Sequence, residues 1–140
     1  MLITGSFDEA GSPTISLRVS GERAAKSHTG IVDTGFSGFV ALPLIEMIPL
    51  GLSTGTAAAS VMLGNGEIIY NLVAQGSVTL NGISKAGSIL LDETTTDVLV
   101  GMAFLRTFEL ALILTDTTVV LHDREETLEA LSPFMQTGPV

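Results

Sequence analysis

The sequence holds 140 residues with a formal net charge of −9, and 46% of its residues are apolar while 15% are charged. This length suits one domain around one core, and the mean hydropathy of +0.52 indicates apolar surface reserved for a partner. The acidic charge argues against nucleic acid and anionic membranes as partners. The absence of cysteine excludes disulfides and thiolate sites, and two histidines give almost no basis for a zinc site.

The first six residues have neither the basic region nor the long apolar region of a secretory signal peptide. No later stretch stays apolar over the length that a membrane-spanning helix needs. A cytoplasmic location is therefore expected.

The first third of the chain is typical of short β-strands separated by turns. Residues 14–19 alternate polar and apolar side chains, which is the period of a half-buried strand. Pro43 suits the start of one helical turn reaching Met47, because its missing N–H is not needed there. The strands expected in this part are residues 2–7, 14–19, 24–32 and 39–42.

The middle of the chain predicts a long hairpin. Three alanines within residues 56–63 favour a helix by propensity, but the run ends in Gly64-Asn65-Gly66. Asn-Gly between apolar runs favours a tight hairpin turn, since both residues tolerate positive φ. We predict the hairpin tip at residues 63–67, with further strands at 73–80 and 84–91.

The last third combines a buried strand, a helix and a hairpin, expected at residues 98–101, 102–107 and 109–122. Asp123 and Glu126 have the spacing of a capping box, which predicts a helix over 125–131 that Pro133 stops. Residues 134–140 are expected to fray. In sum, the predicted fold class is all-β, a closed β-barrel or sandwich with one or two short helices.

One short stretch carries chemistry. An apolar run leads into Asp33, and Val32-Asp33-Thr34-Gly35 resembles the hydrophobic-Asp-Thr-Gly signature of aspartic proteases. Leu99-Val100-Gly101 is similar to the second, hydrophobic-Gly element of that fold, and Gly64-Asn65-Gly66 falls where the family has its flap. The order and length resemble the retropepsin-like, single-domain class. The resemblance predicts a protease domain over residues 1–122, followed by a helix and tail over 123–140.

The resemblance implies an aspartic endopeptidase without cofactor or metal. In that chemistry two carboxylates share one proton, so that one activates water while the other protonates the leaving nitrogen. The chain has one Asp-Thr-Gly, so Asp33 would meet Asp33 of a second copy in a homodimer that binds a peptide or protein substrate. The implied catalytic residues are Asp33, Thr34 and Gly35, the implied substrate-binding residues are Phe36, Ser37, Gly64, Asn65, Gly66 and Val100, and Gly101 would pack under the catalytic loop.

The chain departs from the family pattern at three places. Phe36 stands where relatives often carry Ala or Ser, and without a hydroxyl beside the carboxylate a milder pH optimum is expected. Ser37 and Gly38 replace an acidic pair, so a carboxylate contact to the substrate backbone is lost. Ala103 stands where Asp or Asn is common, which puts dimer strength in question. Phe134-Met135 near the end of the chain is a candidate self-cleavage site, although a surface apolar pair is the simpler interpretation.

Three alternatives stay open from the residues alone. Asp33 taken by itself fits a turn aspartate that caps its own backbone. The same fold could form a catalytically silent module that dimerises or binds peptides. An unrelated small β-barrel binding protein is the third interpretation.

Overall fold

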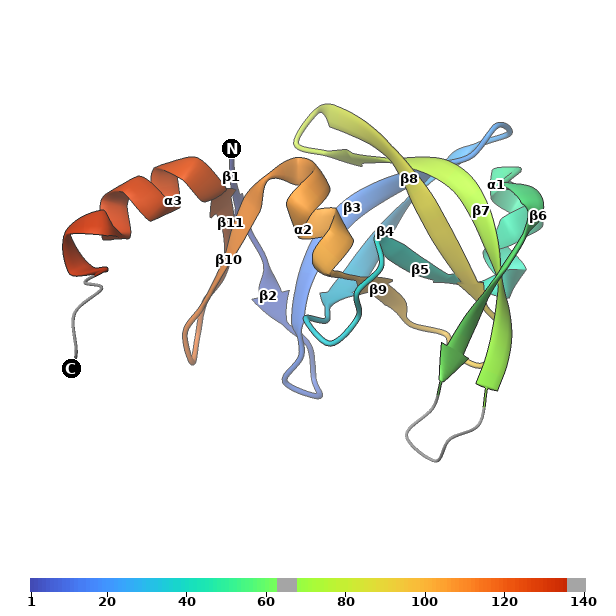
Figure 1. Cartoon of the computed structure of the whole chain (residues 1–140), viewed down its shortest axis with the longest axis horizontal. Helices are drawn as coiled ribbons and strands as arrows, with labels where there is room; N and C mark the ends of the chain where they lie inside the picture. The colour runs from blue at the N-terminus through green and yellow to red at the C-terminus, as the bar shows by residue number, and fades with distance from the viewer. Residues whose placement is uncertain (63–67, 136–140) are drawn as a thin grey trace.

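The computed structural model describes residues 1–62 and 68–135, which form two β-sheets and three short α-helices (Figure 1). The small sheet has the order β1-β11-β10 and the large sheet has the order β2-β3-β4-β9-β5-β8-β7-β6. The strands are β1 (Leu2–Thr4), β2 (Ser6–Phe7), β3 (Pro13–Ser20), β4 (Ala25–Val32), β5 (Val40–Pro43), β6 (Ser53–Met62), β7 (Ile68–Leu80), β8 (Ile83–Asp92), β9 (Val98–Val100), β10 (Leu110–Leu114) and β11 (Val119–Asp123).

The large sheet closes on itself. Strand β3 pairs with β4 on one side and with β7 on the other, through Arg18 to Ser20 opposite Ser77 to Thr79. This second pairing joins β3, β4, β9, β5, β8 and β7 into a barrel of six strands. The predicted all-β barrel with few helices is confirmed.

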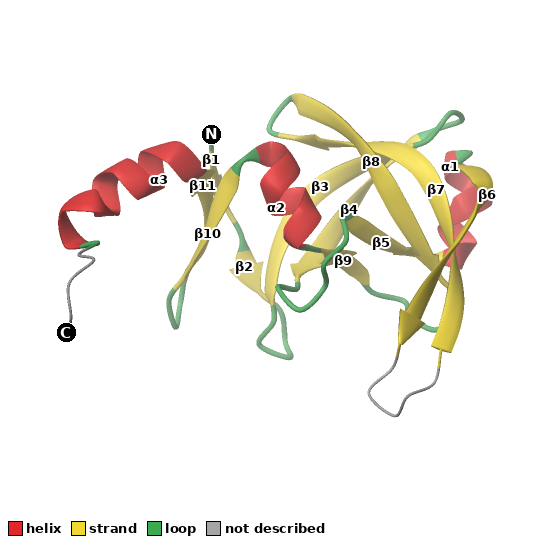
Figure 2. Ribbon diagram, viewed as in Figure 1, coloured by secondary structure: helices red, strands yellow, loops and turns green. Residues whose placement is uncertain are grey.

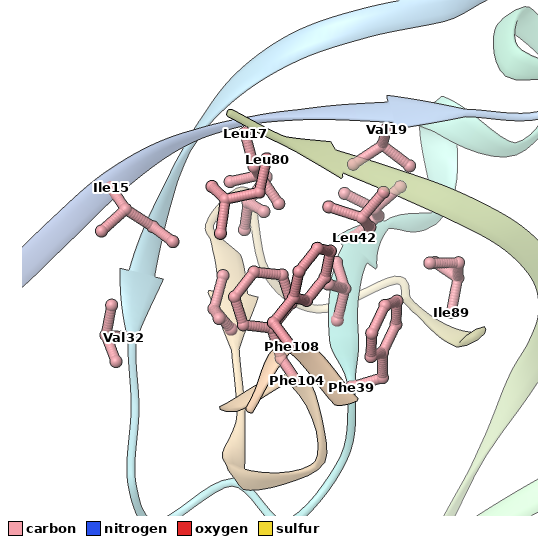
Figure 3. Close-up of a cluster of buried hydrophobic side chains, with 14 of the residues drawn as sticks. Ile15, Leu17, Val19, Val32, Phe39, Leu42, Leu80, Ile89, Phe104 and Phe108 are labelled. Carbon is pink, nitrogen blue, oxygen red and sulfur yellow. The ribbon is translucent and has the colours of Figure 1, made fainter. Parts of the chain in front are cut away.

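The barrel encloses one apolar core. Strand β3 supplies Ile15, Leu17 and Val19 from alternate positions, as a strand with one buried face does. A cluster of three rings, Phe39, Phe104 and Phe108, lies among them, with centroids 4.7 to 6.5 Å apart (Figure 3). Two of these rings come from one helix, so the core holds that helix against the barrel.

The helices are α1 (Met47–Leu50), α2 (Met102–Phe108) and α3 (Arg124–Leu131), and 3-10 turns cover Leu44–Glu46 and Ser132–Phe134 (Figure 2). Helix α2 buries Phe104, Leu105 and Phe108, whereas α3 buries no residue and extends away from the barrel beyond the small sheet. No helix in the described ranges is long and apolar enough to cross a bilayer.

Several expected elements differ in detail. Residues 56–62 of the alanine-rich run lie in the long strand β6, which shows that pairing with β7 outweighs helix propensity. The first strand is interrupted at Gly5 and joins both sheets.

Asp123 stands at the N-cap of α3 without a capping bond, because its carboxylate instead pairs with the amino group of Met1 at 2.5 Å. Met62 pairs with Ile68 at the base of the predicted hairpin, and its tip lies outside the described residues.

Candidate active site

Asp33 lies at the point where the chain leaves the barrel after strand β4. Strand β4 ends at Val32, which is 5% exposed, and the next residue is half-buried at the surface. The backbone N–H of Asp33 donates to the carbonyl of Val100 at 2.9 Å, extending the parallel pairing of β4 with β9 by one step. The strand therefore fixes the direction in which this carboxylate leaves the sheet.

The loop after Asp33 passes around the end of β9 and enters β5, which pairs with the other side of β9. The first free N–H groups of α2 need acceptors, and the loop supplies them. Met102 donates to the carbonyl of Phe36 at 2.8 Å, and Ala103 donates to the carbonyl of Gly38 at 3.1 Å. The helix that is anchored in the core thus holds the loop that carries Asp33.

Gly101 is the contact point between this loop and the strand below it. A Cβ at Gly101 would lie 2.6 Å from the Phe36 carbonyl oxygen and 2.6 Å from its ring. The same ring lies so close to Gly38 that a Cβ there would be 2.5 Å away. Gly101 therefore requires glycine for space, because a Cβ there would meet backbone oxygens of the loop, whereas at Gly38 the Phe36 ring could move aside.

The carboxylate of Asp33 is oriented by its own loop. The N–H of Gly35 donates to Oδ1 of Asp33 at 2.9 Å, and the N–H of Phe36 donates to the Asp33 carbonyl at 3.1 Å. A carboxylate oxygen held by a backbone N–H keeps a defined direction in a half-buried position. The same bond also occurs in ordinary aspartate turns, so it orients the group without defining its chemistry.

A cleft of about 460 Å³ opens beside this carboxylate. Its walls are mainly apolar, and they come from strand ends and from the β10–β11 hairpin. The lining residues are Ser12, Pro13, Ile31, Val32, Asp33, Thr34, Leu99, Leu112 and Leu114. Ile31 and Leu99 could have been found in the sequence, because each alternates with a buried neighbour on its strand. Leu112 and Leu114 could not, since only the tertiary fold brings β10 to Asp33.

The residues expected to contact substrate lie in different surroundings. Ser37 is exposed on the loop, while the half-buried ring of Phe36 covers Gly38 and Gly101. Val100 is fully buried in the core, and its neighbour Leu99 lines the cleft in its place, because successive side chains of a strand point to opposite faces. The other three, Gly64, Asn65 and Gly66, lie outside the described residues.

Charged and metal-ligating groups are sparse around the site. Across residues 1–62 and 68–135, no group of three or more His, Cys, Asp or Glu is placed to hold a metal ion. What the described site can offer chemically is one oriented carboxylate beside an apolar cleft.

Comparison by sequence finds no matching family model and no matching curated protein. Comparison by structure finds a retropepsin-like aspartic protease from Rickettsia conorii with a TM-score of 0.63 at 19% identity, over 88% of this chain and 91% of that one. EIAV protease complexed with the inhibitor HBY-793 matches with a TM-score of 0.58 at 13% identity, over 78% of this chain and 99% of that one. The chain therefore has the retropepsin-like fold.

Proposed function

We propose that this protein is an aspartic endopeptidase that works as a homodimer. The observation that carries the proposal is the placement of Asp33. It is a half-buried carboxylate at the end of a barrel strand, oriented by the Gly35 N–H and held beside an apolar cleft by a loop that the core helix anchors. The proteases with similar folds support the same chemistry at the level of the fold.

The proposed reaction needs two carboxylates. One removes a proton from water as it attacks the peptide carbonyl, and the other gives a proton to the departing nitrogen. Two carboxylates at hydrogen-bond distance share one proton because both cannot ionise easily, and the pair therefore titrates as one unit. Asp33 supplies one carboxylate, and a twofold axis near it would supply the second from an identical chain.

The apolar lining of the cleft favours a peptide substrate with bulky apolar side chains. A peptide that lies extended beside Asp33 would place side chains alternately, and the cleft formed by Ile31, Leu99 and Leu114 accepts an aliphatic or aromatic side chain. We therefore expect cleavage beside bulky apolar residues in unfolded or extended segments.

Proteolysis of a diverse peptide library by the wild-type chain and by Asp33→Asn tests the proposal. The exchange keeps the size of the side chain but removes the proton-transfer group. The cleavage rate should fall by roughly 10²–10⁴-fold, the scale of general acid–base catalysis. Asp97→Asn is the matched control, because Asp97 is exposed in a loop before β9 and should leave the rate unchanged.

Equal peptide cleavage by wild type and Asp33→Asn would disprove this mechanism. A dimer without any cleavage, in a library that covers apolar pairs, would favour the catalytically silent dimerisation or peptide-binding module instead. The hydrogen bond from the Gly35 N–H to the Asp33 carboxylate is compatible with a catalytically silent module as well, since turn aspartates make the same bond.

A further inference from the structure

A further cleft, of about 370 Å³, lies between helix α2 and strand β10, and its volume is within the range of small-molecule sites. Met102, Leu105 and Arg106 of α2 form one wall, since residues three and four positions apart share a face of a helix. The other wall comes from β10, where Leu110 is buried and Leu112 is half-buried. Both walls are therefore apolar except at Arg106.

The two ends of this cleft differ in chemistry. At the start of α2 the N–H of Met102 donates to the loop that contains Thr34, and the Thr34 side chain is part of the lining. At the end of α2 the Glu109 carbonyl accepts the N–H of Arg124, which brings Arg124 into the lining near the last turn of the helix. Arg106 lies in that last turn. The cleft thus leads from a single hydroxyl to a pair of cations.

Arg106 is available to bind an anion. The sequence has 15 acidic and 6 basic side chains, yet the exposed guanidinium of Arg106 makes no ion pair within residues 1–62 and 68–135. Arg124 pairs with Glu109 at 3.6 Å and with Glu125 at 3.5 Å, and these two carboxylates are 73% and 80% exposed. Exposed ion pairs are weak, so a ligand carboxylate displaces them at little cost. A guanidinium binds a carboxylate through two parallel hydrogen bonds.

We propose that this cleft binds a fatty acid, with the carboxylate at Arg106 and Arg124 and the acyl chain along the apolar walls. A ligand with all its polarity at one end matches a lining whose cations lie at one end. A peptide of similar length carries N–H and C=O groups along its whole backbone, whereas the lining side chains offer one hydroxyl, that of Thr34, besides the two guanidinium groups. Buried amide groups without a partner cost free energy, so an acyl chain fits this cleft better than a peptide does.

The fatty-acid site is separate from the proposed peptidase chemistry but adjoins it. Thr34 and Leu112 line both this cleft and the cleft at Asp33. The carboxylate of Asp33 takes no part in holding the fatty acid, so binding does not depend on whether the chain cleaves peptides.

Isothermal titration calorimetry of the full chain with sodium decanoate, below its micelle concentration, tests the site. Decanoate should bind about 15-fold more tightly than octanoate, because each of the two added methylenes contributes about fourfold when it is buried. Acetate has the charge without the chain, and decyltrimethylammonium has the chain with the opposite charge, so neither should bind measurably. Equal affinity for octanoate and decanoate, cation binding as tight as that of decanoate, or no binding of decanoate would overturn the proposal.

Variants of the two walls locate the binding. Arg106→Gln should weaken decanoate binding by about tenfold or more, the contribution of a hydrogen bond to a charged group, and Arg106→Lys should weaken it less because the charge remains. Ala111→Phe on β10 should abolish binding by filling the cleft while both arginines stay in place. The matched control is Arg18→Gln, which removes the same charge from β3, outside the cleft lining, and should leave the affinity unchanged.

Circular dichroism shows whether each variant is folded, and Arg106→Gln at an exposed position remains informative if Ala111→Phe unfolds. Unaltered affinity in either folded variant, or an equal loss in Arg18→Gln, would show that decanoate binds elsewhere. The calorimetry uses no peptide substrate. Its result is therefore distinct from that of the cleavage experiment with Asp33→Asn.

Discussion

Phe36 illustrates how one side chain can set both packing and chemistry. Its ring fills the space above Gly38 and Gly101, and its carbonyl accepts the first N–H of α2. It therefore positions the loop that carries Asp33, and it leaves no hydroxyl at this place in the loop. A serine here could donate a hydrogen bond to a neighbouring carboxylate and favour its ionised form.

Replacing Phe36 by Ser should move the acid limb of the pH–rate profile to lower pH, while Phe36→Ala should not. Both variants lose the ring and its packing, so both should be less stable, and only the serine adds a hydroxyl. The measurement is the rate of peptide cleavage across pH for the three proteins. Acid limbs that coincide in Ser and Ala variants would show that the hydroxyl does not reach the carboxylates.

His28 is expected to make the stability of the barrel depend on pH. It lies on β4 opposite Leu17, and its Nε2 is buried without a hydrogen-bond partner among the described residues. Burial lowers the pKa of His28 below its usual 6.5, and Lys26 adds to this while Glu46 opposes it. Below that usual value the unfolded chain binds a proton more readily than the folded chain, so the free energy of unfolding falls as the pH falls.

The variant His28→Leu should lose part of this pH dependence. Wild type should show a lower melting temperature at about pH 5.5 than at about pH 7.5, since neutral histidine is the form that the fold accepts. The variant should show a smaller difference, because leucine has no proton to gain. Thermal unfolding at both pH values checks this, and an unchanged difference would assign the pH dependence to other groups.

At the scale of elements, α2 connects the core to the site. Phe104 is fully buried and packs on Phe39 and Phe108, while the first N–H groups of the same helix hold the Asp33 loop. The helix was expected over residues 102–107 and is present over Met102–Phe108. Its connection to the loop depends on long-range contacts that no local pattern contains.

Shortening Phe104 to alanine should destabilise the fold by about 3–5 kcal/mol, the cost of removing a buried ring and leaving a cavity. Peptide cleavage should decline as well, because α2 would no longer hold the loop firmly. Ile45→Ala at an 81% exposed position is the control and should change stability by less than about 0.5 kcal/mol. Chemical denaturation of both variants gives the comparison.

At the scale of the whole molecule, the charge of −9 acts against the proposed dimer. Two identical acidic chains repel each other at long range, while apolar contact holds them together. Salt screens the repulsion, since the Debye length falls from about 10 Å at 0.1 M to about 3 Å at 1 M. Added salt should therefore tighten the dimer.

Sedimentation velocity at low and high sodium chloride tests this balance. The dissociation constant should decrease with salt, and the cleavage rate per chain in dilute protein should increase with the dimer fraction. A dimer that salt weakens would indicate that ion pairs, rather than apolar contacts, hold the two chains.

Local sequence determined much of this protein. Alternating side chains and turn residues predicted the strands, and Asp33 after a short apolar run marked the candidate carboxylate. Such features depend on neighbouring residues, so they can be read from one chain without knowing its fold.

Only the tertiary structure decided what surrounds Asp33. Leu112 and Leu114 reach its cleft because β10 packs beside a loop almost 80 positions earlier in the chain, and Val100 turns away because strand alternation assigns it to the core. The alanine-rich run became strand β6 because its pairing with β7 outweighs its helix propensity. Each of these features depends on contacts between segments that are far apart in the sequence, and such contacts form only when the chain folds.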